Sequence, residues 1–185
     1  IASENFAYKN VMEAVGSCLM NKYSEGYPGK RYYGGCMIVD KIEDFVEQDI
    51  VTFRLDPAKW HVNVQGLSGA PVNLAVYAGL LKPGEKIMGL DLTCGGHLSH
   101  GFKTEKKRVS HTSLFWDTDH YRIKEDGFMD YEDDVKSIGI QALDSVAGYS
   151  SYPRDLDYKK FREIADSVGA KLLVDMAHYS GLVSA

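Results

Sequence analysis

Hydrophobic and polar residues recur with two different periods along the chain, and these periods predict helices and strands. Apolar residues spaced by three and four predict helices up to about residue 20 and at residues 39–53 and 158–168. Strongly helix-forming residues predict a helix at 74–81, and a further helix is expected at 130–138. Short apolar or alternating runs predict strands at residues 61–65, 86–91, 109–113, 143–149 and 171–175. Strands that alternate with helices predict an α/β fold, in which a mostly parallel sheet is flanked by helices.

Polar residues follow four of these predicted strands. Ser68-Gly69 follows the first strand and Gly95-Gly96-His97 the second, while Ser150-Ser151-Tyr152 and Asp175 end two later ones. Ligands of open α/β sheets bind outside the carboxyl ends of the strands. We therefore expect these residues to converge on one ligand site.

These residues could bind a ligand that carries both a negative and a positive group. Ser68 and Gly69 begin a predicted helix, where free N–H groups favour phosphate, although an ordinary helix cap is the alternative. Asp175 follows apolar residues and needs donors or a cation to stay ionised. Only His178 lies near it as a second metal ligand, so no metal site is expected. Pyridoxal phosphate would supply both a phosphate and a protonated ring nitrogen, and the Gly-Gly turn at His97 leaves room for its ring. A structural role for His97 stays open.

Composition narrows the class of protein. A net charge of −5 argues against nucleic-acid binding through a broadly basic surface. Three widely spaced cysteines fit no disulfide framework and favour a reducing compartment. No apolar run reaches the roughly 18 residues of a membrane span, and no signal peptide is evident. We expect a cytoplasmic protein, with mitochondria or another organelle left open because the chain begins at Ile1.

The 18 glycines among 185 residues exceed the usual share of about 7%. Many of them cluster beside polar residues, which suggests backbone that approaches a ligand. Residues 21–35 contain four tyrosines and four glycines without apolar periodicity. So long a loop is uncommon unless it has a function, and a tyrosine-rich contact between subunits is the alternative.

Six motifs give the chain a resemblance to serine hydroxymethyltransferases. They are Ala-Ser-Glu-Asn at 2–5, the Tyr- and Gly-rich block at 21–35, Asn-Val-Gln at 63–65, Gly-Gly-His-Leu-Ser-His-Gly at 95–101, Tyr-Pro-Arg-Asp at 152–155 and Val-Asp-Met-Ala-His at 174–178. The resemblance implies the aspartate-aminotransferase-like (fold type I) large domain of pyridoxal-phosphate enzymes. It implies a homodimer or homotetramer with shared active sites, which interconverts serine plus tetrahydrofolate with glycine plus 5,10-methylenetetrahydrofolate.

The resemblance also assigns roles to individual residues. Asp175 would pair with the pyridinium nitrogen, His97 would stack on the ring, and Glu25 would transfer a proton at the serine hydroxyl. The other implied contacts are with the cofactor phosphate (Ser68, Gly69 and, from a second subunit, Tyr23), with the phenolic oxygen of the ring or the substrate carboxylate (Ser150, His178), with the amino acid (Ser3, Tyr33) and with folate (Tyr32, Leu92, Gly96, Leu98).

Two departures from the family pattern qualify these expectations. The phosphate turn reads Ser68-Gly69-Ala70-Pro71 where the family usually has Ser-Gly-Ser, so one hydroxyl donor is missing. A hydrogen bond to a charged group contributes about 1.5–3 kcal/mol, so cofactor affinity could fall roughly tenfold to a hundredfold. Gly66 also replaces a usual proline.

The chain also ends at Ala185, before the threonine-rich His-Lys segment that supplies the Schiff-base lysine in this family. We therefore expect residues 1–35 to form an N-terminal segment with the active-site loop, and residues 36–185 a partial cofactor domain that is inactive as given. A truncated non-catalytic paralogue or partner subunit, and another enzyme of the same fold such as a threonine aldolase, remain alternatives.

Overall fold

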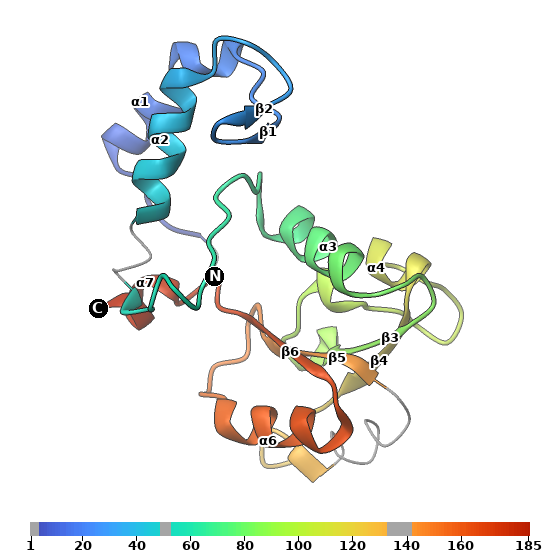
Figure 1. Ribbon diagram of the computed structural model, residues 1–185. Helices are drawn as coiled ribbons and strands as arrows, with labels where there is room; N and C mark the ends of the chain where they lie inside the picture. The colour runs from blue at the N-terminus through green and yellow to red at the C-terminus, as the bar shows by residue number, and fades with distance from the viewer. Residues whose placement is uncertain (1–3, 49–52, 133–141) are drawn as a thin grey trace. The chain divides into compact units, whose positions relative to one another are not determined.

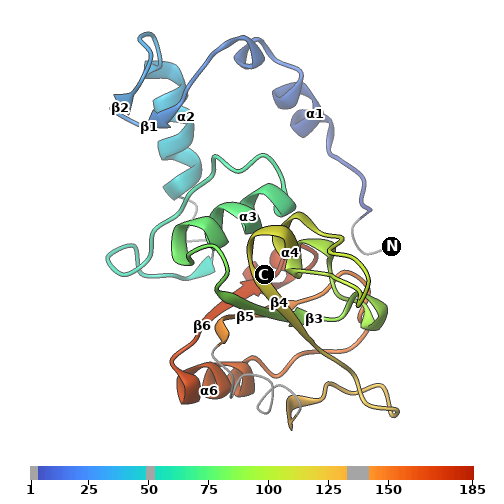
Figure 2. The same cartoon turned by 90° about the vertical axis from the view of Figure 1, so that its right-hand side faces the viewer.

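A computed structural model describes residues 4–48, 53–132 and 142–185 (Figures 1 and 2). The contacts divide the described chain into two compact units. Unit 1 is Leu67–Tyr179, and unit 2 is Glu4–Gly66 together with Ser180–Ala185. The division between residues 35 and 36, made from the sequence, stays a prediction.

Unit 1 has the α/β architecture that the sequence predicts. Four strands pair in parallel in the order β4-β3-β5-β6: β3 (Lys86–Leu90), β4 (Asp117–Tyr121), β5 (Ala142–Gly148) and β6 (Lys171–Asp175). All of β3 after Lys86 is buried, as is typical of a parallel strand covered on both faces. The predicted strands at 86–91, 143–149 and 171–175 are therefore confirmed.

Helices cover both faces of this sheet (Figure 1). On one face, Tyr77 and Leu81 of helix α3 (Gly69–Leu80) and its C-terminal cap pack with Ile87 and Val146. On the other face, Phe161 and Ile164 of helix α6 (Tyr158–Val168) pack with Met88 and Ala147. The alternation along β3 and β5 thus sends neighbouring side chains into two separate apolar clusters. The predicted helices at 74–81 and 158–168 are therefore confirmed, and α6 has the apolar face that its sequence predicts.

The segment between β3 and β4 contains three short helical elements, and here one prediction is wrong. They are the 3₁₀ turns η3 (Leu92–Cys94) and η4 (Leu98–His100) and the helix α4 (His111–Phe115). Residues 109–113 do not form a strand, because the Ser110 side chain accepts a hydrogen bond from the Ser113 N–H and caps α4. The strand lies instead at β4, whose sequence Asp-Thr-Asp-His-Tyr gives little apolar signal.

Unit 2 consists of short elements, namely α1 (Lys9–Val15), η1 (Cys18–Asn21), a β1 (Gly26–Tyr27) and β2 (Lys30–Arg31) hairpin, α2 (Met37–Glu47) and α7 (Ser180–Ser184). The predicted helix up to about residue 20 is confirmed in α1, which ends earlier, and the predicted helix at 39–53 is confirmed in α2, although residues 49–52 lie outside the described residues. The predicted strand at 61–65 is wrong: these residues make no strand pairing, and Asn63 and Gln65 bond through their side chains to the hairpin.

Most of the predicted helix at 130–138 lies outside the described residues. Across the part of the chain that is described, no helix is long and apolar enough to cross a membrane.

Candidate functional site

The carboxylate of Asp175 stands at the carboxyl end of β6 and is bound by three donors. Its Oδ2 accepts hydrogen bonds from Asn73 Nδ2 and His100 Nε2, both at 2.9 Å, and its Oδ1 accepts one from the Ala177 N–H at 3.2 Å. The side chain is 17% exposed. Asp175 thus has the donors that its apolar surroundings led us to expect.

These donors keep the carboxylate ionised. The hydrogen bond from His100 is the largest influence that lowers the pKa of Asp175, and the bonds from Asn73 and Ala177 add to it. Burial opposes them, yet the pKa lies well below its ordinary value. A permanent negative charge is therefore fixed at this edge of the sheet.

A chain of hydrogen bonds connects this carboxylate to His97. Asn73 Nδ2 also donates to Ser99 Oγ at 2.9 Å, and Ser99 Oγ lies 2.7 Å from His97 Nδ1. His97 Nδ1 further accepts the Ser99 N–H at 3.2 Å, which leaves Nε2 as the protonated nitrogen of a neutral ring. Burial, followed by the charge of His100, lowers the pKa of His97 and favours that neutral form.

The turn that carries His97 is fixed by close backbone approaches. Asp91 accepts bonds from the N–H and hydroxyl of Thr93 and pairs with Arg122 at 3.1 Å, which holds the start of η3. A Cβ at Gly96 would lie 1.9 Å from the Leu90 carbonyl oxygen, so no side chain fits there. The Gly95 carbonyl accepts the N–H groups of Ser150 and Ser151, which joins this turn to the loop after β5.

Helix α3 begins beside this site with Ser68 in extended conformation at φ −166°. The Ser68 side chain does not cap the helix, and Pro71 has no N–H, so the exposed amides of Gly69 and Ala70 remain at the positive end of the helix dipole. Asn73 follows Ser68 by five residues, which at 1.5 Å per residue is about 7.5 Å along the axis. Asn73, about one turn and a half beyond the helix start, is the residue of α3 that binds Asp175.

A cavity of about 520 Å³ opens next to His97. Its lining comes from the start of α3, from η4 and from the segment that leads into α4: Ala70, Pro71, Leu74, His97, Leu98, Ser99, Val109, Ser110, His111 and Thr112. Most of this lining is apolar. His97 thus lines a largely apolar space while its Nδ1 is hydrogen-bonded to Ser99.

Unit 1 brings together most of the residues that the sequence singled out. His97 and Asp175 are connected through Asn73 and Ser99, and His178 lies close enough to lower the pKa of His97. Leu92, Gly96 and Leu98 share the turn after β3, and Ser150 is bonded to it. The predicted strand before Ser68 is absent, so Ser68 and Gly69 enter the site from an irregular segment.

The remaining candidates lie elsewhere. Glu25, Tyr23, Tyr32 and Tyr33 belong to unit 2, where all four side chains are exposed. Ser3 lies outside the described residues.

Sequence reasoning missed Asn73, Ser99 and His100. A signal existed for Asn73, because it precedes buried Tyr77 and Leu81 at spacings of four and so shares their inward face, where a polar group needs a partner. The bonds of Ser99 to Asn73 and of His100 to Asp175 have no such signal, since these partners lie 26 and 75 residues away.

Comparisons with known proteins identify the family of this chain. The family model described as serine hydroxymethyltransferase matches residues 1–185. The chain is 56% identical over 188 residues to "Serine hydroxymethyltransferase 3, chloroplastic" of Arabidopsis thaliana, 52% identical over 190 residues to "Probable serine hydroxymethyltransferase, cytosolic" of Schizosaccharomyces pombe, and 51% identical over 190 residues to "Serine hydroxymethyltransferase, cytosolic" of Oryctolagus cuniculus.

Each comparison covers 100% of this chain but only 36%, 40% and 39% of the respective relative. The relatives are named for the chloroplast and the cytosol, so they leave the compartment of this protein open. Because the family model matches the whole chain, the protein belongs to the serine hydroxymethyltransferase family.

Proposed function

We propose that this chain forms part of a pyridoxal-phosphate-dependent enzyme that interconverts serine plus tetrahydrofolate with glycine plus 5,10-methylenetetrahydrofolate. The observation that carries the proposal is the ionised Asp175 carboxylate, held by Asn73 and His100 and connected to a neutral His97. The match of the whole chain to the family supports it.

The residues present fit pyridoxal phosphate. A protonated ring nitrogen requires an ionised carboxylate, and Asp175 is one. A phosphate suits the free amides at the start of α3, about 7.5 Å from Asn73 along the helix. The neutral imidazole of His97 offers a flat face without a competing charge. The start of α3, His97 and Asp175, which would bind the phosphate, the ring and the ring nitrogen, all belong to unit 1.

In this proposal each group of the chain has one task. When bound, pyridoxal phosphate supplies a carbonyl carbon that joins the substrate amine and a ring that accepts electrons from its α-carbon. Asp175 accepts the hydrogen bond of the ring nitrogen and keeps that nitrogen protonated. His97 supports the ring, and Ser68 and Gly69 bind the phosphate, with Tyr23 contributed by a second copy of the chain.

The remaining roles are those that the family resemblance implies. Glu25 exchanges a proton with the serine hydroxyl, a task that needs a carboxyl group with a pKa closer to neutrality in the assembled site. Ser150 and His178 lie near the phenolic oxygen or the substrate carboxylate, and Ser3 and Tyr33 contact the amino acid. Tyr32, Leu92, Gly96 and Leu98 contact folate.

We further propose that the α/β sheet is part of a fold type I large domain and that the enzyme is a homodimer or homotetramer. The apolar residues that α1 and α2 expose, among them Met12, Val15 and Phe45, support an interface between copies. Light scattering on the full gene product tests the oligomeric state, and a monomer at micromolar concentration would contradict it.

The decisive experiment measures serine cleavage by the full gene product with pyridoxal phosphate present, with and without tetrahydrofolate. We expect glycine formation that depends on tetrahydrofolate, together with a visible absorption band of the bound cofactor. Cofactor binding without any folate-dependent cleavage of serine would rule out the proposed reaction.

A further inference from the structure

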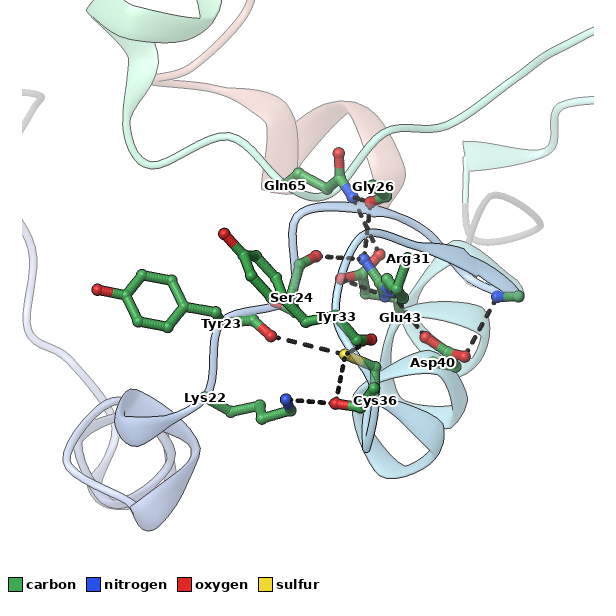
Figure 3. A network of polar contacts seen from close by, with 12 residues as sticks. Lys22, Tyr23, Ser24, Gly26, Arg31, Tyr33, Cys36, Asp40, Glu43 and Gln65 are labelled. Carbon is green, nitrogen blue, oxygen red and sulfur yellow. Dashed lines mark hydrogen bonds and ion pairs between the residues drawn. The ribbon is translucent and has the colours of Figure 1, made fainter.

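The guanidinium of Arg31 is the centre of a polar network in unit 2 (Figure 3). Its side chain is only 4% exposed. Nη1 donates to the carbonyl oxygens of Ser24 and Gly26, both at 2.7 Å. A buried guanidinium that binds two backbone carbonyls fixes the path of the chain between them.

The residue between those two carbonyls is Glu25. The carbonyl of Glu25 itself accepts the Tyr32 N–H at 3.1 Å. Three successive carbonyls, at residues 24, 25 and 26, are therefore held by donors from β2 and the residue after it. The Glu25 side chain is exposed, and the backbone held by Arg31 sets the point and the direction in which this side chain leaves the chain.

Two carboxylates of α2 hold Arg31 in turn. Nε donates to Asp40 Oδ1 at 2.7 Å, and Nη2 pairs with Glu43 Oε1 at 2.9 Å. Asp40 Oδ2 also accepts the Gly29 N–H in the hairpin turn at 3.2 Å. The hydrogen bond from Arg31 is the main reason why the pKa of Asp40 is lowered, so this carboxylate stays charged. Through Asp40 and Glu43, helix α2 holds the hairpin in place.

Residues of the Asn-Val-Gln motif at 63–65 also bind the hairpin, a role that the family resemblance does not assign to them. Gln65 Nε2 donates to the Gly26 carbonyl at 2.5 Å and to Glu43 Oε2 at 3.3 Å. Gln65 therefore touches both the held backbone and the carboxylate that holds Arg31. Asn63 Nδ2 reaches the hydroxyl of Tyr27 in the same hairpin at 3.3 Å.

We propose that Arg31 is the positioning residue for Glu25, and that Gln65 assists it by binding the same Gly26 carbonyl. This inference rests on the proposed function, in which Glu25 transfers a proton. A lysine at position 31 keeps the positive charge but has a single ammonium group, which cannot reach two carbonyls and two carboxylates in these directions. The charge alone therefore does not replace the guanidinium.

The test uses the full gene product with Arg31→Lys, Glu25→Gln and the corresponding double variant. We expect Arg31→Lys to lower kcat at least tenfold, with a smaller change in KM for serine. In the Glu25→Gln background the same substitution should change kcat less than about twofold, because a residue that acts through Glu25 has nothing left to position. Arg54→Lys makes the same exchange at an exposed position of unit 2 and should leave kcat unchanged.

Hydrogen exchange provides a readout that needs no activity. Amides of residues 24–33 should exchange about tenfold faster in Arg31→Lys than in the parent protein, and the control should match the parent. Gln65→Leu changes an exposed side chain and should give a smaller acceleration, which keeps the proposal testable if Arg31→Lys does not fold.

Unchanged exchange in both variants, or additive losses in kcat, would overturn the inference. A Glu25→Gln variant with normal kcat would overturn it as well. If the parent protein has no folate-dependent activity while exchange accelerates as expected, the proposed function fails, and the role of Arg31 in holding residues 24–26 is supported.

Discussion

The two units of this protein are stabilised by different kinds of interaction. Unit 1 has an apolar core in which Tyr77, Ile87 and Phe161 are fully buried on the two faces of the sheet. In the described residues of unit 2, Cys36 is the one apolar side chain that is buried. Its thiol lies 3.5 and 3.3 Å from the carbonyl oxygens of Tyr23 and Tyr33, next to the network of Arg31.

The two units therefore hold their candidate functional side chains in different ways. In unit 1 the core aligns strand ends, so that side chains distant in sequence, such as Asn73 and Asp175, meet, and the Asn73 amide helps to keep Asp175 ionised. In unit 2 side chains bind backbone carbonyls, and the exposed residues Glu25 and Tyr33 project from a backbone held in place. The following predictions test this contrast, from the largest expected effect to the smallest.

Removing a core side chain should destabilise unit 1 far more than a similar change destabilises unit 2. Phe161→Ala deletes a fully buried ring and should lower the free energy of unfolding by about 3–5 kcal/mol. Phe6→Ala, at a side chain that is 97% exposed ahead of α1, should cost less than about 0.5 kcal/mol in the same urea titration. Comparable losses would mean that unit 2 has a core of its own.

Neutralising Asp175 should remove the charge on which the site depends. We expect Asp175→Asn to weaken pyridoxal phosphate binding about a hundredfold, since a charge-assisted hydrogen bond contributes up to about 3 kcal/mol. Absorbance titration of the full gene product measures it. Asp166→Asn changes an exposed carboxylate on α6 and serves as control. Normal affinity in Asp175→Asn would refute the pairing with the ring nitrogen.

The support that Asn73 gives to Asp175 should depend on pH. A hydrogen bond that lowers the pKa of a carboxyl stabilises the folded state fully above the ordinary pKa of about 3.9, and this contribution is lost as the pH falls through the folded-state pKa, which lies well below that value. Asn73→Ala should therefore cost about 1–3 kcal/mol at pH 7 and nearly as much at pH 4, with the loss confined to more acidic solution. Urea titrations at both values test this. A cost that has already fallen by half at pH 4 would contradict a strongly lowered pKa of Asp175 in the folded protein.

The smallest effect concerns the phosphate turn. Ala70→Ser restores a hydroxyl at the start of α3 and should raise affinity for pyridoxal phosphate up to about tenfold. Ala75→Ser adds the same group at an exposed position farther along α3 and should not. Fluorescence titration distinguishes the two, and equal affinities for both variants would show that the backbone amides are sufficient.

The sequence predicts strands best where their residues are apolar. Strands β3 and β6 are apolar runs and were found, whereas β4 reads Asp-Thr-Asp-His-Tyr and was missed, although β4 and β6 both lie at edges of the described sheet. The alternation at 61–65 is misleading, because Asn63 and Gln65 are polar to bind the hairpin rather than to face solvent from a strand.

The sequence predicts only those residues of the candidate site that stand out in a local pattern. Asp175 and His97 stand out because charge or imidazole follows a strand or a Gly-Gly pair. His100 does not, since its partner lies 75 residues away and no local pattern announces such a pairing.

The contact between Gly96 and Leu90 limits how this protein can vary. A methyl group at position 96 would overlap the Leu90 carbonyl oxygen, which belongs to the central part of the sheet and cannot withdraw. In a library of variants selected only for soluble protein, without cofactor or substrate, replacements of Gly96 should therefore be depleted. Inherited variation at this position would then act through the amount of folded protein and not through turnover.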